Sequence, residues 1–339
     1  MPTITTVIPS YRRPTLLKRA IESVLAQDYR DLEVCVYDDA SGDETSKVAT
    51  KIAQRDSRVK YFCNEQNIGL VANFAQGVAR VRTPFFNLLS DDDYLAPGFF
   101  NEGLRALRRR PSARLFIGCL SLVHNESVIG MPVHAWREGI YDPNDTLAKL
   151  TDHRQSLTWT SMIFDSRVLQ TVGGVDTETG YVIDIDFELR VATRYPAVVS
   201  TKPCAFFTAH PGAHLGDYFL SLLEGLPRIL TSVDRECGDA HAAGDLDWRG
   251  VAKRRQTVRR GFRDWVFRWS VAATCSGLTG QAPIAAQVLE DVLGAPRRAE
   301  IVRTIADESA KGAIAREGYR WLRWARTVAR GTCNRHRHR

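Results

Sequence analysis

The sequence of 339 residues lacks the hallmarks of several common protein classes. Its seven cysteines include no C-x-x-C pair, so free thiols in a reducing compartment are expected rather than a zinc site or a disulfide framework. No apolar stretch approaches the roughly 20 residues of a transmembrane helix, and the first residues run directly into a strand pattern. We therefore expect neither a membrane span nor a signal peptide.

Glycine-rich phosphate-binding loops are missing as well. No G-x-G-x-x-G follows the first expected strand and no G-x-x-x-x-G-K-[ST] occurs anywhere, which argues against a dinucleotide dehydrogenase, a P-loop NTPase and a nucleotidyltransferase. The net charge of +7 reflects arginines that become frequent from about residue 249. Because no aromatic strand platform or recognition-helix motif accompanies them, no nucleic-acid partner is predicted.

What the first 90 or so residues do contain is an alternation of strand and helix patterns. Strands are expected at residues 3–8, 32–37, 59–62 and 84–89, and helices at residues 14–27, 44–54 and 69–81. This order predicts an α/β fold with a mostly parallel, Rossmann-like sheet flanked by helices. In such sheets ligands bind beyond the carboxyl ends of the strands.

Three consecutive aspartates, Asp91, Asp92 and Asp93, follow the fourth expected strand. They repel one another and lose hydration unless a positive group compensates them. A divalent cation shared with substrate phosphates is one solution, and a solvated acidic turn that caps the next helix is the alternative. Polar residues also follow the first and second strands, at positions 9–11 and 38–39. This convergence favours a nucleotide site.

Five stretches stand in a familiar order: residues 6–11 (TVIPSY), 20–27 (AIESVLAQ), 36–43 (VYDDASGD), 67–69 (NIG) and 90–93 (SDDD). Together they resemble the signature series of family 2 glycosyltransferases of the GT-A fold. The resemblance is dense over about residues 1–110 and looser to about residue 215. It implies a catalytic domain over residues 1–215, followed by an α-helical region at 216–330 and a basic, disordered tail at 331–339.

The resemblance implies roles for the positions that would bind the nucleotide. Pro9 and Tyr11 would line the nucleobase pocket, with Tyr11 packing on the base. Asp39 would accept a hydrogen bond from a pyrimidine N–H, which implies a uridine or thymidine donor. Asn67 would belong to the same site, and Asp91 would approach the ribose.

A metal site is implied beside the diphosphate. Asp92 would hold Mg²⁺ or Mn²⁺ with support from Asp93, although Ser90 stands where many relatives carry a further aspartate. His210, in a stretch similar to the family's His–x–Gly loop, would contact a phosphate or complete the metal shell. A purely structural histidine is the alternative.

Transfer to a hydroxyl also needs a carboxylate that accepts the proton of the attacking alcohol. The segment at residues 181–190 (YVIDIDFELR) resembles the family's helix that carries this base. It places the base on Asp184, near a helix N-terminus, with Asp186 and Arg190 as supporting partners. Two alternatives stay open: Asp184 as a helix cap only, and Asp186 as the base.

The C-terminal region shows helical patterns and few strand signals. The last helix is expected from about residue 298 to 329, with arginines on one arc and Trp321 and Trp324 on the opposite arc. Such a helix is typical of contact with an anionic membrane surface. Packing of the tryptophan face on the catalytic domain is the alternative.

The sequence therefore predicts a metal-dependent glycosyltransferase that moves a sugar from a UDP- or dTDP-sugar to a hydroxyl acceptor. The acceptor is expected to be a glycan or glycolipid of the cell surface. The expected location is the cytoplasm, with peripheral contact at the inner face of the membrane. The alternative is a sugar-nucleotide-binding protein without turnover, recruited to the membrane surface by its basic helix.

Overall fold

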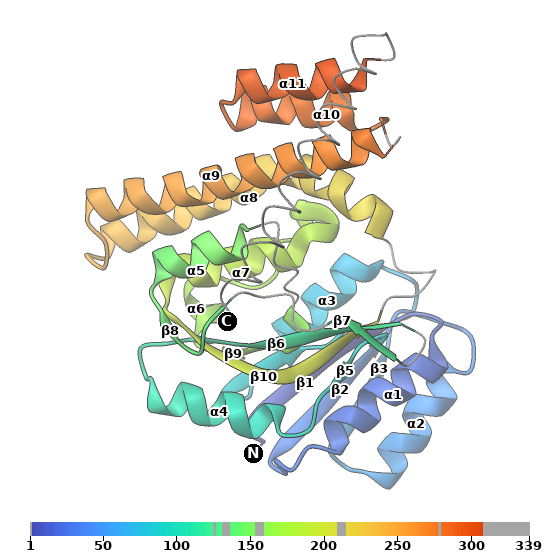
Figure 1. Cartoon of the computed structure of the whole chain (residues 1–339). Coiled ribbons are helices and arrows are strands. Elements are labelled where there is room, and N and C mark those ends of the chain that lie inside the picture. Colours follow the sequence, from blue (N-terminus) through green and yellow to red (C-terminus); the bar gives the residue numbers. More distant parts are fainter. Residues whose placement is uncertain are drawn as a thin grey trace, which may run out of the picture. The chain divides into compact units, whose positions relative to one another are not determined.

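The computed structural model of the chain describes residues 2–124, 127–130, 136–152, 159–208, 215–276 and 279–307 (Figure 1). It divides into two compact units: Met1–Leu150 with Arg154–Val258, and Thr151–His153 with Arg259–Arg339. The sequence predicts a domain boundary at residue 215, whereas the helix that begins there, α8 (Leu215–Ala242), lies in the first unit. It does so because it packs on neighbouring helices and buries an apolar face made of Leu222, Leu226, Ile229 and Val233.

The described strands of the first unit form one mixed sheet in the order β3-β2-β1-β4-β9-β6-β10-β5, with β7 beside β6 and β8 beside β10. Strands β1 to β4 pair in parallel, whereas β9 runs antiparallel to both β4 and β6. The strands are β1 (Ile4–Ser10), β2 (Leu32–Asp38), β3 (Val59–Cys63), β4 (Phe85–Leu88), β5 (Tyr94–Leu95), β6 (Leu115–His124), β7 (Ser127–Gly130), β8 (Gly139–Tyr141), β9 (Met162–Asp165) and β10 (Ala197–Thr208). The expected α/β fold class is confirmed.

Helices cover both faces of this sheet. Figure 1 shows α1, α2 and α4 on one face and α3 and α7 on the other. The first-unit helices, including the short 3₁₀ segments η1 and η2, are α1 (Pro14–Leu25), α2 (Thr45–Arg55), α3 (Leu70–Ala79), α4 (Phe99–Arg109), α5 (Pro143–Leu150), η1 (Trp159–Ser161), α6 (Val168–Thr171), η2 (Thr177–Val182), α7 (Ile183–Arg194) and α8. The predicted helices at residues 14–27, 44–54 and 69–81 are confirmed with small differences at their ends.

The packing of the sheet follows from the periodicity of the sequence. Helix α1 begins at Pro14, whose fixed φ suits a first turn, and buries Leu17, Ile21 and Val24 at helical spacing. Helix α3 comes close to the other face of the sheet at Gly77, where a Cβ atom would lie 2.4 Å from a side-chain carbon of Val7. Both helices are thereby fixed directly beside the strands that carry the candidate site.

Helix α9 (Trp248–Cys275) passes from the first unit into the second, which continues with α10 (Ala282–Gln287), the π-helical η3 (Val288–Val292) and α11 (Pro296–Ala306). The expectation of one last helix to residue 329 is wrong in its extent: α11 ends at Ala306, because Asp307 has a ψ of 127°. Residues 308–339, with Trp321 and Trp324, lie outside the described residues.

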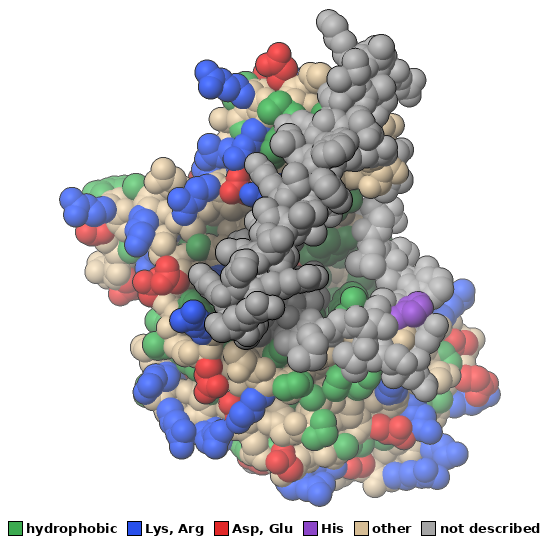
Figure 2. All heavy atoms as spheres, in the orientation of Figure 1, with side chains coloured by type: hydrophobic (Ala, Val, Ile, Leu, Met, Phe, Trp, Pro, Cys, Tyr) green, Lys and Arg blue, Asp and Glu red, His purple; other side chains and the backbone are tan. Residues whose placement is uncertain are grey.

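Two surface properties bear on the partners that were expected. None of the described helices is both long and apolar enough to cross a bilayer. On the face shown in Figure 2, Lys and Arg side chains are interspersed with Asp and Glu side chains over the lower part of the molecule.

The six cysteines within the described ranges are free thiols.

Candidate active site

The carboxyl ends of three strands meet at one edge of the sheet. Ser10, the last residue of β1, pairs with Asp38, the last residue of β2, and its carbonyl accepts a hydrogen bond from the amide of Asp39 at 2.9 Å. Strand β4 lies on the other side of β1, and the amide of Leu89 donates to Val7. The structure therefore brings together the residues that follow β1, β2 and β4.

Tyr11 is the exposed aromatic side chain at this edge. It is 40% exposed, and the guanidinium carbon of Arg12 lies 5.0 Å from its ring centroid. Arg12 has a φ of 55°, an uncommon value for a non-glycine residue, and Ser41 fixes it by accepting from the Arg12 amide at 2.9 Å. Pro9 lies one step back, buried in β1 opposite Tyr37. Tyr11 therefore presents a partly exposed ring at this edge, with the Arg12 guanidinium beside it.

Asp39 organises the loop that leads into α3. Its Oδ1 accepts from the side-chain amide of Asn64 at 2.9 Å and from the backbone amide of Ile68 at 2.8 Å, and its Oδ2 accepts from the amide of Gly69 at 2.9 Å. Asn67 accepts from the same Gly69 amide at 3.0 Å. The carboxylate is 2% exposed. The sequence analysis did not foresee this structural role.

The three aspartates after β4 have different surroundings. Asp91 is buried and accepts from the Ser10 hydroxyl at 2.7 Å, while Arg13 bridges Asp91 at 3.1 Å and the half-buried Asp92 at 2.6 Å. Burial, together with the charge of Asp92, raises the pKa of Asp91 to about 6. Asp93 faces inward, where it accepts from the Thr208 amide and the Thr160 hydroxyl, each at 2.9 Å.

Two arginines that the sequence analysis missed serve this acidic corner. Besides Arg13, the guanidinium of Arg19 in α1 donates to the backbone carbonyl of Asp92 and to the Thr208 hydroxyl, and it lies 4.5 Å from the ring centroid of Tyr94. The acidic triplet itself indicates that a cation is needed nearby, because carboxylates that repel one another are stabilised by a positive charge. The cation expected from the sequence is a divalent metal, and the structure adds these two arginines.

A hard divalent cation fits this corner in part. Asp92 is only half-buried, beside Asp91, and carboxylate oxygens suit Mg²⁺ or Mn²⁺ with phosphate and water completing the shell. Both oxygens of Asp93 already accept hydrogen bonds from the protein. Within the described ranges no group of three or more His, Cys, Asp or Glu side chains is arranged to hold a metal, and His210 lies outside those ranges.

The predicted base lies at the start of α7. Asp184 is half-buried, its Oδ1 accepts from the amide of Ile185 at 2.9 Å, and the phenol of Tyr218 in α8 lies 3.2 Å from each carboxylate oxygen. Burial raises the pKa of Asp184 to about 6. One turn further along, buried Glu188 has an Oε1 atom without a hydrogen-bond partner among the residues that the structure describes. Tyr218 and Glu188 were missed, although the four-residue spacing of Asp184 and Glu188 was a readable signal.

Asp186 and Arg190 form a buried ion pair on the same helix. The Arg190 Nε lies 2.7 Å from the Asp186 carboxylate, and both side chains are almost fully buried. Arg190 also donates to the carbonyl oxygens of Val172 and Gly174, which ties α7 to the loop after α6. Because Asp186 is enclosed and paired, the open alternative of Asp186 as the base is disfavoured relative to Asp184.

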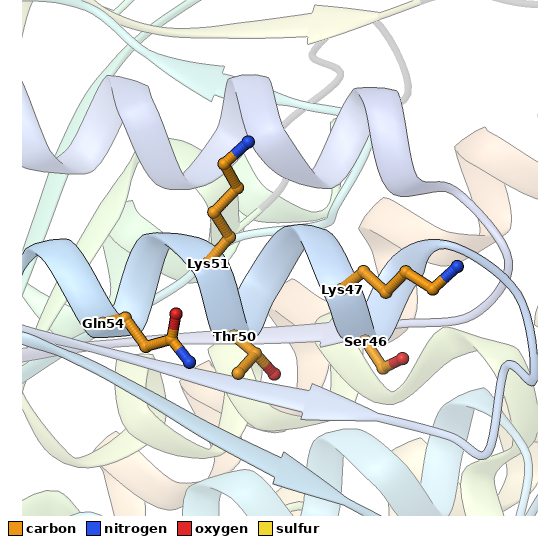
Figure 3. A pocket seen from close by; sticks show the side chains of 5 residues that line it. All are labelled: Ser46, Lys47, Thr50, Lys51 and Gln54. Atoms are coloured by element: carbon orange, nitrogen blue, oxygen red, sulfur yellow. The ribbon is translucent and has the colours of Figure 1, made fainter.

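An open hollow along α2 does not belong to this site. It is lined by side chains from successive turns of that one helix: Ser46, Lys47, Thr50, Lys51 and Gln54 (Figure 3). Lys47 is already paired with Glu44 at 2.7 Å. The strand-end edge, with its buried carboxylates and arginines, is the better candidate for chemistry.

Comparison with known proteins bears on the family and the fold of the chain. Residues 5–153 match the sequence model of glycosyl transferase family 2. A GalNAc(5)-diNAcBac-PP-undecaprenol beta-1,3-glucosyltransferase of Campylobacter jejuni is 35% identical over 121 residues, which is 35% of this chain and 39% of the relative. An uncharacterized glycosyltransferase of Haemophilus influenzae is 31% identical over 96 residues, 28% of this chain and 38% of the relative. The chain thus spans about two fifths of the length of these relatives.

Solved structures share the fold over most of the chain. Residues 1–349 of S. aureus TarS superpose with a TM-score of 0.67 at 15% identity, covering 95% of this chain and 92% of that one. A TarS complex with UDP-GlcNAc gives 0.67 at 16% identity, with 97% and 92% covered. The mannosyltransferase PcManGT of Pyrobaculum calidifontis, in complex with GDP-Man and Mn²⁺, gives 0.51 at 15% identity, with 90% and 87% covered. These similarities confirm the GT-A fold, and residues 5–153 are similar to glycosyl transferase family 2.

Proposed function

We propose that this protein is a glycosyltransferase that moves a sugar from a nucleoside-diphosphate donor to a hydroxyl acceptor. The observation that carries the proposal is the meeting of Tyr11, Asp39, Asp91 and Asp92 at one sheet edge. Asp184 lies in the first turn of α7, directly after η2, and η2 packs against α3. Helix α3 follows the loop whose amides of Ile68 and Gly69 donate to Asp39. The family match and the nucleotide-sugar complexes of fold relatives support the same reading.

On the donor side, the Tyr11 ring stacks on the nucleobase and Pro9 closes the pocket behind it. Asp39 keeps acceptor capacity for a pyrimidine N–H, because a carboxylate has about four lone-pair sites. This preference points to UDP- or dTDP-sugars. Asn67 borders the base, and Asp91, held by Ser10, faces the ribose.

At the diphosphate, Asp92 would hold Mg²⁺ or Mn²⁺, with support from Asp93 at the end of the strand and with His210 as a further candidate contact. When bound, the metal supplies positive charge against the departing diphosphate. The guanidinium groups of Arg13 and Arg19 lie at the same acidic corner. They orient the donor and neutralise part of the negative charge of its phosphates.

On the acceptor side, Asp184 is the general base. As the acceptor oxygen forms its bond to the anomeric carbon, Asp184 takes the hydroxyl proton and the bond to the diphosphate oxygen breaks, so one displacement inverts the anomeric centre. With a pKa near 6, Asp184 is mostly ionised at neutral pH and still basic enough to accept that proton. Asp186 and Arg190 hold the helix that presents it.

The acceptor is a glycan or glycolipid of cell-surface polysaccharide or glycolipid synthesis. Support comes from the Campylobacter jejuni relative, whose name specifies a polyprenol-linked acceptor. Such an acceptor places the protein in the cytoplasm at the inner membrane face, with the basic C-terminal region in contact with anionic lipid.

The test is a donor panel: purified protein, Mn²⁺, common nucleotide sugars and polyprenol-linked or free glycan acceptors, with release of nucleoside diphosphate as the readout. We expect turnover with a uridine or thymidine sugar. Asp184→Asn should bind UDP with wild-type affinity and lose transfer, whereas Asp145→Asn, an exposed acid of α5, should retain it. Transfer at the wild-type rate by Asp184→Asn would refute Asp184 as the base.

A further inference from the structure

Asp184, Glu188 and Tyr218 form a cluster without a cation among the contacts of the described residues. Asp184 and Glu188 stand four residues apart on α7, so their side chains share one face of the helix. Tyr218 reaches over from α8 and its hydroxyl is 3.2 Å from both oxygens of Asp184. This differs from the acidic triplet at the strand ends, where Arg13 bridges two carboxylates.

Glu188 is placed where a charged carboxylate is costly. It is 4% exposed, and within the described part of the chain its Oε1 atom has no hydrogen-bond partner. Burial and the neighbouring charge of Asp184 raise the pKa of Glu188 well above its ordinary value. A buried acid in this situation keeps its proton instead of ionising.

Tyr218 is held in the donor state. Burial, followed by the charges of Asp184 and Glu188, raises the pKa of its phenol well above the ordinary value. A phenol that keeps its proton can donate it as a hydrogen bond to a carboxylate. Such a bond favours the ionised form of Asp184 and fixes the direction of its side chain.

Charged groups on the other elements packed against α7 include two exposed acids, a half-buried lysine and an ion-paired glutamate. Asp145 of α5 and Glu224 of α8 are exposed, and Lys149 of α5 is half-buried. Glu178 of η2 lies 3.6 Å from Arg228. On α7 itself, Asp186 is paired with Arg190.

We propose that Tyr218 and Glu188 are positioning residues for Asp184: the Tyr218 hydroxyl orients and stabilises the Asp184 carboxylate, and Glu188 stays neutral beside it. This inference rests on the proposed role of Asp184 as the base. It adds a division of labour within the cluster. Asp184 alone exchanges a proton with the acceptor, Tyr218 donates a hydrogen bond without losing its proton, and Glu188 avoids a second negative charge.

The test is the pH profile of kcat/KM between about pH 5 and about pH 9 for three variants and the wild type. In Tyr218→Phe the ring remains and the donor is lost, so the acidic limb should move to higher pH by about one pH unit. Transfer near pH 6 should then fall several-fold more than transfer near pH 8. The matched control is Tyr195→Phe, which removes a hydroxyl that donates to Thr171 on the surface, and its profile should follow the wild type.

Glu188→Gln tests the neutral state of Glu188, because Gln imitates the protonated acid. Its acidic limb should lie within a few tenths of a pH unit of the wild-type limb. A limb lowered by about one pH unit or more would mean that Glu188 is ionised, and would overturn this part of the inference. The thermal midpoint and UDP affinity of each variant check that it is folded.

The outcomes separate this inference from the proposed function. If Tyr218→Phe loses activity equally at every pH, or if its limb coincides with the wild-type limb, Tyr218 has only a structural role and the inference fails. If Asp184→Asn keeps full transfer, the assignment of the base fails first. Loss of transfer in Asp184→Asn with an unmoved limb in Tyr218→Phe rejects the inference alone.

Discussion

The two acidic regions of the first unit differ in what compensates them. At the strand ends, Asp91 and Asp92 share the guanidinium of Arg13, and the Arg19 guanidinium donates to the backbone carbonyl of Asp92. At the start of α7, Asp184 receives a hydrogen bond from an uncharged phenol. The Arg13 charge favours the ionised form of Asp91 against the opposing effect of burial, whereas Asp184 has only neutral hydrogen-bond donors to offset its burial. The same residue type is thereby suited to electrostatics in one region and to base catalysis in the other.

Helix α7 also contains one carboxylate that, unlike Asp184, is paired with an arginine. Asp186 lies two residues from Asp184 but is fully buried and paired with Arg190. Asp186→Ala leaves that guanidinium buried and unpaired, so the free energy of unfolding should fall by about 3–5 kcal/mol. Urea unfolding followed by circular dichroism measures it. Lys18→Gln, which removes one member of an exposed pair with Glu22, should change it by less than about 1 kcal/mol.

If Asp186→Ala destabilised the protein no more than Lys18→Gln, the Asp186–Arg190 pair would not anchor α7. The Asp186→Ala variant would then report on catalysis and not on stability. A folded Asp186→Ala that lost transfer entirely at neutral pH would return Asp186 to consideration as the base.

The donor region should respond most strongly to the loss of Asp92. Asp92→Asn keeps the shape but removes a charge that we expect to hold the metal, so transfer should fall about 10²–10³-fold. A chelator should silence the wild type in the same assay of diphosphate release. Asp43→Asn, an exposed aspartate beyond β2, serves as the control and should keep its activity. Full activity of Asp92→Asn in the presence of chelator would remove the metal from the mechanism.

The acceptor region should instead be revealed by pH. Asp184 accepts a proton only when it is ionised, and its pKa lies near 6. Activity should therefore be lost on the acidic side. Below about pH 6, kcat/KM should fall about tenfold for each pH unit. Stopped assays of transfer over this range measure the limb. A limb near pH 4, typical of an exposed aspartate, would show that Asp184 is not the titrating group.

Much of the donor region was predictable from the sequence because its signals are local. Strand patterns, the parallel order and the rule that ligands bind at carboxyl ends placed Tyr11, Asp39 and Asp92 at one edge. The resemblance to the family then implied their roles. The resemblance of residues 181–190 to a helix of the family also located α7 and Asp184.

The rest depends on contacts between distant residues. Arg13 meets Asp92 across 79 positions, and Tyr218 meets Asp184 across 34. Asp39 accepts hydrogen bonds from the amides of Ile68 and Gly69, about 30 positions away along the chain. No local sequence pattern indicates these contacts. The spacing of the three aspartates in the sequence does not show whether arginine or a metal compensates their charge. Either cation satisfies the same electrostatic demand.

Arg13 offers the finest way to sharpen the contrast between the two regions. In the structure its guanidinium lies 2.6 Å from the Asp92 carboxylate, where a divalent cation would also bind. Arg13→Gln removes a competing cation, so the protein without donor should bind Mn²⁺ several-fold more tightly, as titration calorimetry would measure. Arg105→Gln, which removes an exposed partner of Glu102, should leave the Mn²⁺ affinity at the wild-type value. Weaker Mn²⁺ binding in Arg13→Gln would mean that Arg13 orders the carboxylates for the metal instead of competing with it.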